Sequence, residues 1–168
     1  MKWEFSAGGI VYKTVNGLEF NVQGNAGGVL WLIRKPKAGH GYRGKIGWCF
    51  PKGLIEEKSK IQSPKSKKDK IESLEETALR EVEEEGGVKA KIIAKLPTQK
   101  FMFKDKDNEW VMKFVTYFLM EWQKDLKQGF GWETEETKWV SLEQAKNLLI
   151  YKNDKELLDK AASLLTQI

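Results

Sequence analysis

Residues 71–87 have the spacing of an amphipathic helix that also concentrates negative charge. Placed on a helical wheel at about 100° per residue, four apolar side chains share one stripe: Ile71, Leu74, Ala78 and Val82. Such a stripe is typical of a helix that packs on a hydrophobic core. Gly86 and Gly87 follow it and suit a helix C-terminal cap. The segment therefore predicts a helix over residues 71–85 that covers part of a larger core.

Three glutamates lie close to this stripe. Glu85 falls inside it, Glu81 lies at its edge, and Glu84 lies a little further round. Their i, i+3, i+4 spacing brings the side chains to one patch, although clustered carboxylates near a core lose hydration and repel one another. A divalent cation such as Mg²⁺ or Mn²⁺, which prefers carboxylate oxygens, would offset that cost. A solvated acidic helix face is the alternative.

The charge of the whole chain agrees with a cation site that faces an anionic ligand. Residues 72–85 hold seven glutamates and one arginine, in a chain whose net charge is +5. An acidic element within a basic protein suggests this arrangement, but charge alone also fits a solvated helix.

Length and composition indicate one soluble globular domain over residues 1–168. Hydrophobic residues are 40% and charged residues 32% of the 168 residues, as expected for a packed domain. No apolar run reaches the roughly 18–20 residues that span a membrane, and the N-terminus lacks the pattern of a signal peptide. One cysteine, Cys49, and one histidine exclude a disulfide framework and argue against a zinc site of those ligands. We expect a cytoplasmic protein in which Cys49 is buried.

The remaining pattern predicts a mixed α/β (α+β) domain. Strands are expected at residues 5–13, 29–35, 48–50, 88–96, 99–104, 110–122 and 137–140, with a hairpin region at 16–28 and a turn at 51–53. Helices are expected at 71–85, 142–150 and 154–166. The last two would begin with capping boxes, Ser141 with Gln144 and Asn153 with Glu156.

The segment at about 54–70 is rich in lysine and is predicted to be an exposed loop insertion. It is either a solvated insertion or an electrostatic collar for a polyphosphate or an RNA 5′ end.

The acidic segment resembles the signature of the Nudix hydrolase family. That signature is glycine, five residues, glutamate, seven residues, then Arg-Glu-aliphatic-any-Glu-Glu-any-Gly-aliphatic. From Glu72 to Val88, which ends in REVEEEGGV, every constrained position matches. Gly53 lies nineteen residues before Glu72 where the signature has six, so the intervening loop is expanded. Four further segments are also similar to the family: SAGGIVYK, LWLIRK, GWCFPKG and KWVSLEQA. They extend the resemblance over about residues 5–150.

The resemblance implies an α/β/α sandwich with a central mixed sheet. It also implies hydrolysis of a nucleoside diphosphate linked to another group, with Mg²⁺ (or Mn²⁺) held by Glu81, Glu84 and Glu85. Arg80 and Glu72 would be supporting residues. A further glutamate, as metal ligand or base, is expected in GWETEETKW. Glu135 is the candidate, and Glu133 and Glu136 are the alternatives.

Basic residues near the box are candidates for binding the substrate. Lys52 precedes Gly53, where a cation could hold a phosphate. Arg34 and Arg43 are further phosphate candidates, for each of which a solvated surface position is the favoured interpretation. Phe130 and Trp132 could stack on a base or pack in the core.

The sequence PKG resembles that of diadenosine and diphosphoinositol polyphosphate hydrolases. We therefore expect a diadenosine or nucleoside polyphosphate as substrate, with removal of RNA 5′-pyrophosphate as the alternative. A non-catalytic Nudix-like module that binds nucleotide or RNA, and a metal-free interaction protein, are the rival hypotheses. The sequence predicts no oligomeric state.

Overall fold

The computed structural model describes residues 1–15, 28–39, 45–56 and 71–167. Most of the hairpin region expected at 16–28, Arg43 and most of the lysine-rich segment lie outside the described residues. Within the described ranges, no helix has both the length and the apolar character needed to cross a membrane.

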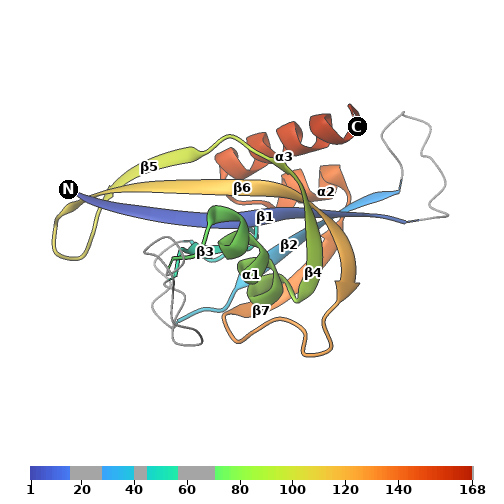
Figure 1. The fold of residues 1–168 in the computed structure, drawn as a ribbon, viewed down its shortest axis with the longest axis horizontal. Coiled ribbons are helices and arrows are strands. Elements are labelled where there is room, and N and C mark those ends of the chain that lie inside the picture. Colours follow the sequence, from blue (N-terminus) through green and yellow to red (C-terminus); the bar gives the residue numbers. More distant parts are fainter. Residues whose placement is uncertain (16–27, 40–44, 57–70, 168) are drawn as a thin grey trace.

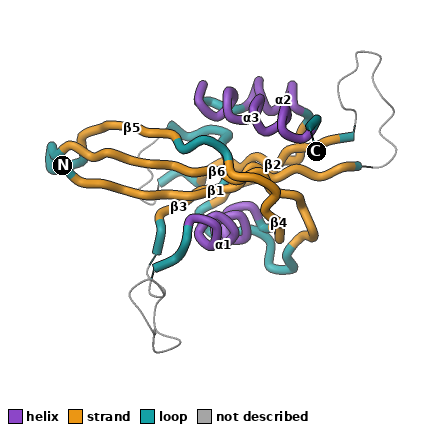
Figure 2. The backbone as a smooth tube through the Cα atoms, turned by 45° about the horizontal axis from the view of Figure 1, so that its top comes forward, coloured by secondary structure: helices purple, strands orange, loops and turns teal. Residues whose placement is uncertain are grey.

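A mixed sheet lies between two helical layers (Figures 1 and 2). Helix α1 (Leu74–Gly86) covers one face. Helices α2 (Leu142–Leu148) and α3 (Lys152–Leu165) lie together over the other. The expected α/β/α sandwich with a mixed sheet and three helices is therefore confirmed.

The sheet has seven strands, with β4-β6-β1-β2-β7 as its main order, β3 paired to β1 and β5 paired to β6. Its strands are β1 (Lys2–Thr14), β2 (Val29–Pro36), β3 (Lys52–Leu54), β4 (Val88–Lys95), β5 (Gln99–Lys104), β6 (Trp110–Asp125) and β7 (Thr134–Val140). Strands β1 and β6 run parallel, and the other pairs are antiparallel. The parallel pair brings residues 2–12 beside residues 111–121, so the sheet joins segments that are far apart in the sequence.

Two glycines let other parts of the chain approach β1 closely. A Cβ atom on Gly8 would collide with the carbonyl oxygen of Pro51, and one on Gly9 would collide with Val82 of α1. Strand β3 and helix α1 can therefore both pack against the middle of β1, one near Gly8 and the other at Gly9.

Each face of the sheet has its own core. On the α1 side, Ala78 and Val82 pack with Val11 and Phe118. On the other side, Ile10 and Tyr117 pack with residues of α2 and α3 such as Leu158. Cys49 is buried, as predicted.

The predicted start of α1 is wrong by three residues. Ser73 is the N-cap, its Oγ accepts a hydrogen bond from the Glu76 N–H, and Glu76 completes a capping box. Ile71 therefore precedes the helix and is 52% exposed, so it does not belong to the core stripe. A serine three residues before a glutamate was the available signal.

Three other local predictions are also wrong. Residues 48–50 form isolated bridges, Arg34 with Cys49 and Trp48 with Leu149, and no strand. Residues 51–53 are not only a turn, because β3 begins at Lys52. The N-cap of α3 is Tyr151, because Asp154 and Lys155 both donate their N–H groups to its carbonyl oxygen. The Tyr151 side chain forms no capping hydrogen bond. Asn153 therefore lies inside the helix.

Candidate active site

The C-terminal half of α1 lies against β3 and presents two buried carboxylates there. Glu81 and Glu85 are each only 6% exposed, as their places on the apolar stripe predicted. Glu84 is different, because its side chain is 57% exposed. The three glutamates therefore lie on one side of the helix at two different depths.

Arg80 is the cation around which the acidic residues of this segment gather. Its Nε lies 2.7 Å from Glu72 Oε1, and its Nη1 lies 2.8 Å from Glu81 Oε1 and 3.1 Å from Glu84 Oε2. Its Nη2 also donates to the Leu54 carbonyl oxygen at 3.0 Å. Burial of Glu72 opposes its ionisation, but hydrogen bonds, above all from Arg80, outweigh this and lower the pKa of Glu72. Arg80 therefore connects the start and the end of α1 to β3.

Glu85 has a separate set of partners. Its Oε2 lies 3.2 Å from Nη1 of Arg34, and it accepts a hydrogen bond of 3.0 Å from the Lys52 backbone N–H. Arg34 is itself buried, and it donates from Nε to Thr134 Oγ1 and from Nη2 to the Glu133 carbonyl oxygen. The solvated surface position favoured for Arg34 from the sequence is therefore wrong.

Burial dominates the proton affinity of both carboxylates. It raises the pKa of Glu85 to about 8, although Arg34 opposes the shift. It raises the pKa of Glu81 to about 7, against the effect of Arg80. Both values lie well above the roughly 4.3 of a free glutamate, so neither partner fully compensates for lost hydration.

Gly53 is required by the close packing of β3 on α1. A Cβ atom at this position would collide with the carboxylate of Glu81. The glycine expected before the box therefore makes room for a carboxylate, and its φ is not in the left-handed region.

The two ends of the segment between β3 and α1 meet at Glu56 and Glu72. The Glu72 N–H donates to the Glu56 carbonyl oxygen at 3.0 Å, and the Glu56 N–H donates to Glu72 Oε2 at 3.2 Å. Gly53 and Glu72 are thus held near each other despite the nineteen-residue spacing.

The donor chemistry of the site fits a hard divalent cation. Glu81 and Glu85 offer buried oxygens that are incompletely neutralised, which is what Mg²⁺ or Mn²⁺ binds. In the described part of the chain, however, no three His, Cys, Asp or Glu side chains are grouped to hold a metal ion. The reason is visible in the contacts, because Arg80 draws Glu84 and Arg34 draws Glu85. Binding by all three glutamates would require these side chains to turn.

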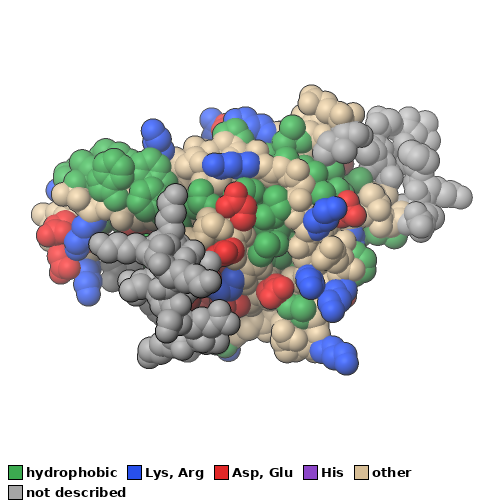
Figure 3. Space-filling model, viewed as in Figure 1, with side chains coloured by type: hydrophobic (Ala, Val, Ile, Leu, Met, Phe, Trp, Pro, Cys, Tyr) green, Lys and Arg blue, Asp and Glu red, His purple; other side chains and the backbone are tan. Residues whose placement is uncertain are grey.

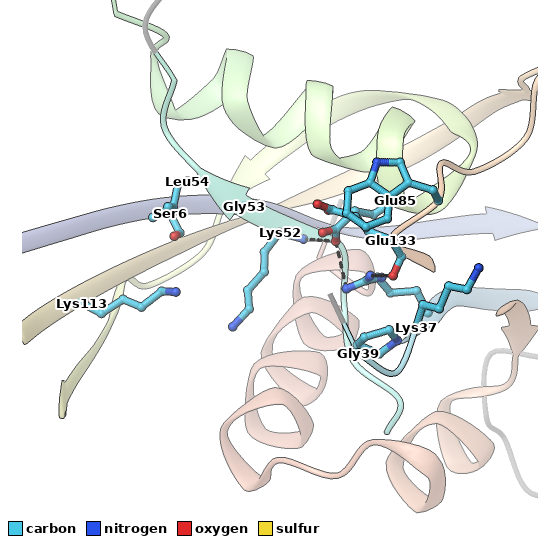
Figure 4. A pocket seen from close by; sticks show the side chains of 12 residues that line it. Ser6, Lys37, Gly39, Lys52, Gly53, Leu54, Glu85, Lys113 and Glu133 are labelled. Atoms are coloured by element: carbon cyan, nitrogen blue, oxygen red, sulfur yellow. Dashed lines mark hydrogen bonds and ion pairs between the residues drawn. The ribbon is translucent and has the colours of Figure 1, made fainter. Parts of the chain in front are cut away.

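A cavity of about 290 Å³ opens beside Glu85 (Figure 4). Glu85 and Glu133 lie at one end of it. The other charged side chains of its lining are cationic: Arg34, Lys37, Lys52 and Lys113. A cavity with this charge pattern suits a polyanion that reaches the carboxylates at one end.

Residues 14–161 match the family description "NUDIX domain". The chain belongs to the Nudix hydrolase family. This match spans most of the chain and includes α1, so the acidic helix is the Nudix box, in a family of pyrophosphohydrolases.

A mycobacterial protein resembles nearly the whole chain at low identity. "Putative mutator protein MutT4" of Mycobacterium tuberculosis is 26% identical over 165 residues, which is 98% of this chain but 57% of that protein. The chain therefore spans little more than half the length of this relative.

Solved structures share the fold. An Ap4A hydrolase of C. elegans, in a binary complex, has a TM-score of 0.61 at 20% identity and covers 98% of this chain and 99% of its own. The NUDIX domain of Shewanella oneidensis NrtR, complexed with ADP ribose, has a TM-score of 0.59 at 18% identity and covers 98% of this chain and 90% of its own. At these identities the likeness shows the Nudix fold alone.

The structure places the predicted substrate-binding residues unevenly. Lys52, Gly53 and Arg34 line the cavity beside the Nudix box. Arg43 lies outside the described residues. Trp132 also lines the cavity and is 63% exposed, so core packing does not explain it.

Among the candidate glutamates after the box, position distinguishes one. Glu133 lines the cavity, and its charge raises the pKa of both Glu81 and Glu85. Glu135 is not part of the lining; its side chain is 53% exposed and lies 3.8 Å from Nζ of Lys35. We therefore favour Glu133 over Glu135 as the further carboxylate of this Nudix site.

Sequence reasoning missed Ser6 and Lys113, which also line the cavity. They come from β1 and β6, which pair in parallel. No local pattern in the sequence indicates that these two segments lie side by side.

Proposed function

We propose that this Nudix protein is a divalent-metal-dependent pyrophosphohydrolase of a diadenosine or nucleoside polyphosphate. The observation that supports it best is the position of Glu85, at one end of a cavity whose other charged lining is mainly cationic. Lysines and arginines bind phosphate oxygens, while the carboxylates are the natural place for a metal.

Each residue of the site has a proposed role. Glu81, Glu84 and Glu85 are the proposed metal ligands, and the metal would neutralise phosphate oxygens and lower the pKa of a bound water. Arg80 orients Glu81 and Glu84 from the side. Arg34, which lies 3.2 Å from Glu85, keeps that carboxylate close to the cavity. Glu133 is proposed as a further ligand or as the base.

A substrate panel with Mg²⁺ tests this function. Diadenosine and nucleoside polyphosphates are incubated with the protein, and products are separated by chromatography. Glu84→Gln and Glu85→Gln should reduce turnover by more than the roughly 10–100-fold that loss of a supporting partner costs. Glu83→Gln is the matched control, because Glu83 is exposed and occupies an unconstrained position of the box. A wild-type protein that is inactive across the panel would refute the proposal and favour a non-catalytic module.

Removal of RNA 5′-pyrophosphate is the second candidate, and an exposed aromatic face supports it. Trp3 and Phe5 of β1 are 62% and 46% exposed. Their rings lie 5.4 and 5.2 Å from that of Phe114 on β6, and Lys100 Nζ lies 5.7 Å from the same ring. In Figure 3, hydrophobic side chains gather at one end of the molecule. Aromatic rings beside lysines suit the stacking of single-stranded bases.

The aromatic face also adjoins the Nudix box. The Ile55 N–H, one residue beyond β3, donates to the Phe5 carbonyl oxygen at 3.1 Å. If RNA is the substrate, Trp3→Ala should raise the KM for a 5′-triphosphorylated oligonucleotide and leave that for a dinucleotide polyphosphate unchanged. Ile150→Ala, an exposed apolar residue that follows α2, is the control. Equal effects on both substrates would count against the RNA reading.

A further inference from the structure

Three polar side chains of the cavity form no hydrogen bond or ion pair with the described residues. Ser6 on β1, Lys52 on β3 and Lys113 on β6 all line it. The Ser6 side chain is buried, at 1% exposure. Among the described residues, its Oγ is the buried side-chain polar atom without a hydrogen-bond partner. A buried hydroxyl in that state costs free energy, so a ligand that accepts its hydrogen bond would be favoured.

The two lysines contribute positive charge to the lining of the cavity. In the described part of the chain, Nζ of neither Lys52 nor Lys113 forms a hydrogen bond or an ion pair. The charge of Lys52 also acts on the buried carboxylate of Asp154, whose pKa burial raises and Lys52 lowers. Burial lowers the pKa of Lys113, and so does the charge of Lys52, while Glu4 acts in the opposite direction. Two like charges that affect each other in a partly desolvated cavity are stabilised by an anion placed between them.

Strand pairing fixes the three residues on one side of the sheet. In the parallel pair, Glu4 lies opposite Lys113 and Ser6 lies opposite Val115. Ser6 and Lys113 therefore share a sheet face, because positions two apart on a strand point the same way. Figure 4 shows Ser6, Lys52 and Lys113 along one side of the cavity, away from α1.

Lys52 links this group to the Nudix box. Its backbone N–H donates to Glu85 at 3.0 Å, while its side chain lies in the cavity. It pairs with Gly8, and a Cβ atom on Gly8 would lie 2.7 Å from the Lys52 Cβ. The glycine thus allows β3 to approach β1 so closely. An anion bound by Lys52 is consequently held close to the carboxylate end of the cavity.

We propose that Ser6, Lys52 and Lys113 form an anion subsite that binds the distal phosphates of the substrate and selects for the length of its polyphosphate chain. The substrate class rests on the proposed function, but the anion subsite itself does not. The new assignments are Ser6 and Lys113, which would determine specificity without taking part in bond cleavage.

Binding of inorganic tripolyphosphate tests the subsite without catalysis. Isothermal titration calorimetry is run on the full chain in EDTA. A charge-assisted hydrogen bond contributes roughly 1.5–3 kcal/mol, so Lys113→Met should weaken binding by about 10-fold or more. Lys124→Met is the matched control, because it removes the same charge from an exposed position on the same strand. Loss of affinity in Lys113→Met alone supports the subsite; equal affinity of the two variants overturns it.

Ser6→Ala keeps the test valid if Lys113→Met fails to fold. Removing a buried hydroxyl without a partner should leave thermal stability equal to or above that of the wild type. It should still weaken tripolyphosphate binding by about 10-fold or more, as expected for a hydrogen bond to a charged phosphate oxygen. If Ser6 had only a structural role, Ser6→Ala would leave the affinity for tripolyphosphate unchanged. Unchanged affinity would therefore overturn the role of Ser6 in the subsite.

Hydrolysis distinguishes this inference from the proposed function. With Mg²⁺, Lys113→Met should raise KM more for a diadenosine tetraphosphate than for a diadenosine triphosphate, with kcat little changed. Equal changes in KM for both would overturn the selection of chain length. If the wild type hydrolyses neither substrate but binds tripolyphosphate through Lys113, the proposed function fails and the anion subsite stands.

Discussion

Replacing Gly53 with alanine should displace the Glu81 carboxylate without disturbing the backbone. Gly53 does not have a positive φ, so alanine can adopt its conformation. The atoms that the new methyl group would meet belong to the Glu81 carboxylate, which is the end of a side chain that can turn. To turn away, however, Glu81 must give up the 2.8 Å hydrogen bond from Arg80 Nη1.

The expected loss of stability follows from that one contact. A hydrogen bond to a charged group contributes roughly 1.5–3 kcal/mol. Replacing glycine with alanine restores about 0.4–1 kcal/mol by restricting the unfolded chain. Gly53→Ala should therefore lower the free energy of unfolding by about 1–2 kcal/mol. It should also reduce any metal-dependent activity, because Glu81 no longer lies where a metal is proposed to bind.

A double-mutant cycle with Glu81→Ala tests whether Gly53 acts through this carboxylate. Urea unfolding is measured for the wild type, both single variants and the double variant. When the carboxylate is absent there is no collision, so Gly53→Ala should be neutral or stabilising by about 0.4–1 kcal/mol. The two substitutions should therefore be strongly non-additive. An equal cost of Gly53→Ala in both backgrounds would refute the reasoning.

Three further predictions concern α1. Arg80→Lys should lower the free energy of unfolding by roughly 1.5–3 kcal/mol in urea titrations, because an ammonium cannot reproduce the guanidinium's several hydrogen bonds; a change below about 0.5 kcal/mol would contradict the central place given to Arg80. In EDTA, the free energy of unfolding should fall as pH rises from about 5 to 8, because burial raises the pKa of Glu81 to about 7 and that of Glu85 to about 8. In this range the folded state retains protons that the unfolded chain, whose glutamates have a pKa of about 4.3, has lost. Equal free energies of unfolding from urea titrations at about pH 5 and about pH 8 would argue against buried, uncompensated carboxylates. Ser73→Ala should lower the free energy of unfolding by about 1 kcal/mol through loss of the capping box, and an unchanged urea midpoint would show that the cap is dispensable.

The sequence was most informative where geometry is local. Spacing along one helix was sufficient to place Glu85 on the buried side and Val82 in the core, because a helix fixes the direction of every side chain relative to its neighbours. The same reasoning failed for Ile71, since the helix begins only after its N-cap at Ser73 and Ile71 lies before that cap. Local capping signals are real but compete, as Asn153 shows by lying inside α3.

Features that depend on pairing between distant segments could not be predicted. The burial of Arg34 depends on Thr134, the first residue of β7, and on Glu133, which precedes that strand. The meeting of Ser6 with Lys113 depends on the parallel pairing of β1 and β6. Equally, the choice of Glu133 over its neighbour Glu135 depends on where one loop runs past the cavity. None of these has a signature in the adjacent sequence.

The hydrogen bonds between Glu56 and Glu72 close a ring of chain between β3 and α1. The free-energy cost of closing such a ring grows only logarithmically, at about 0.6 kcal/mol for each doubling of its length. We therefore expect that residues added between Glu56 and Glu72 would alter the packing of β3 on α1 little. This point of the Nudix fold is a natural position for grafting a peptide or a whole domain beside helix α1.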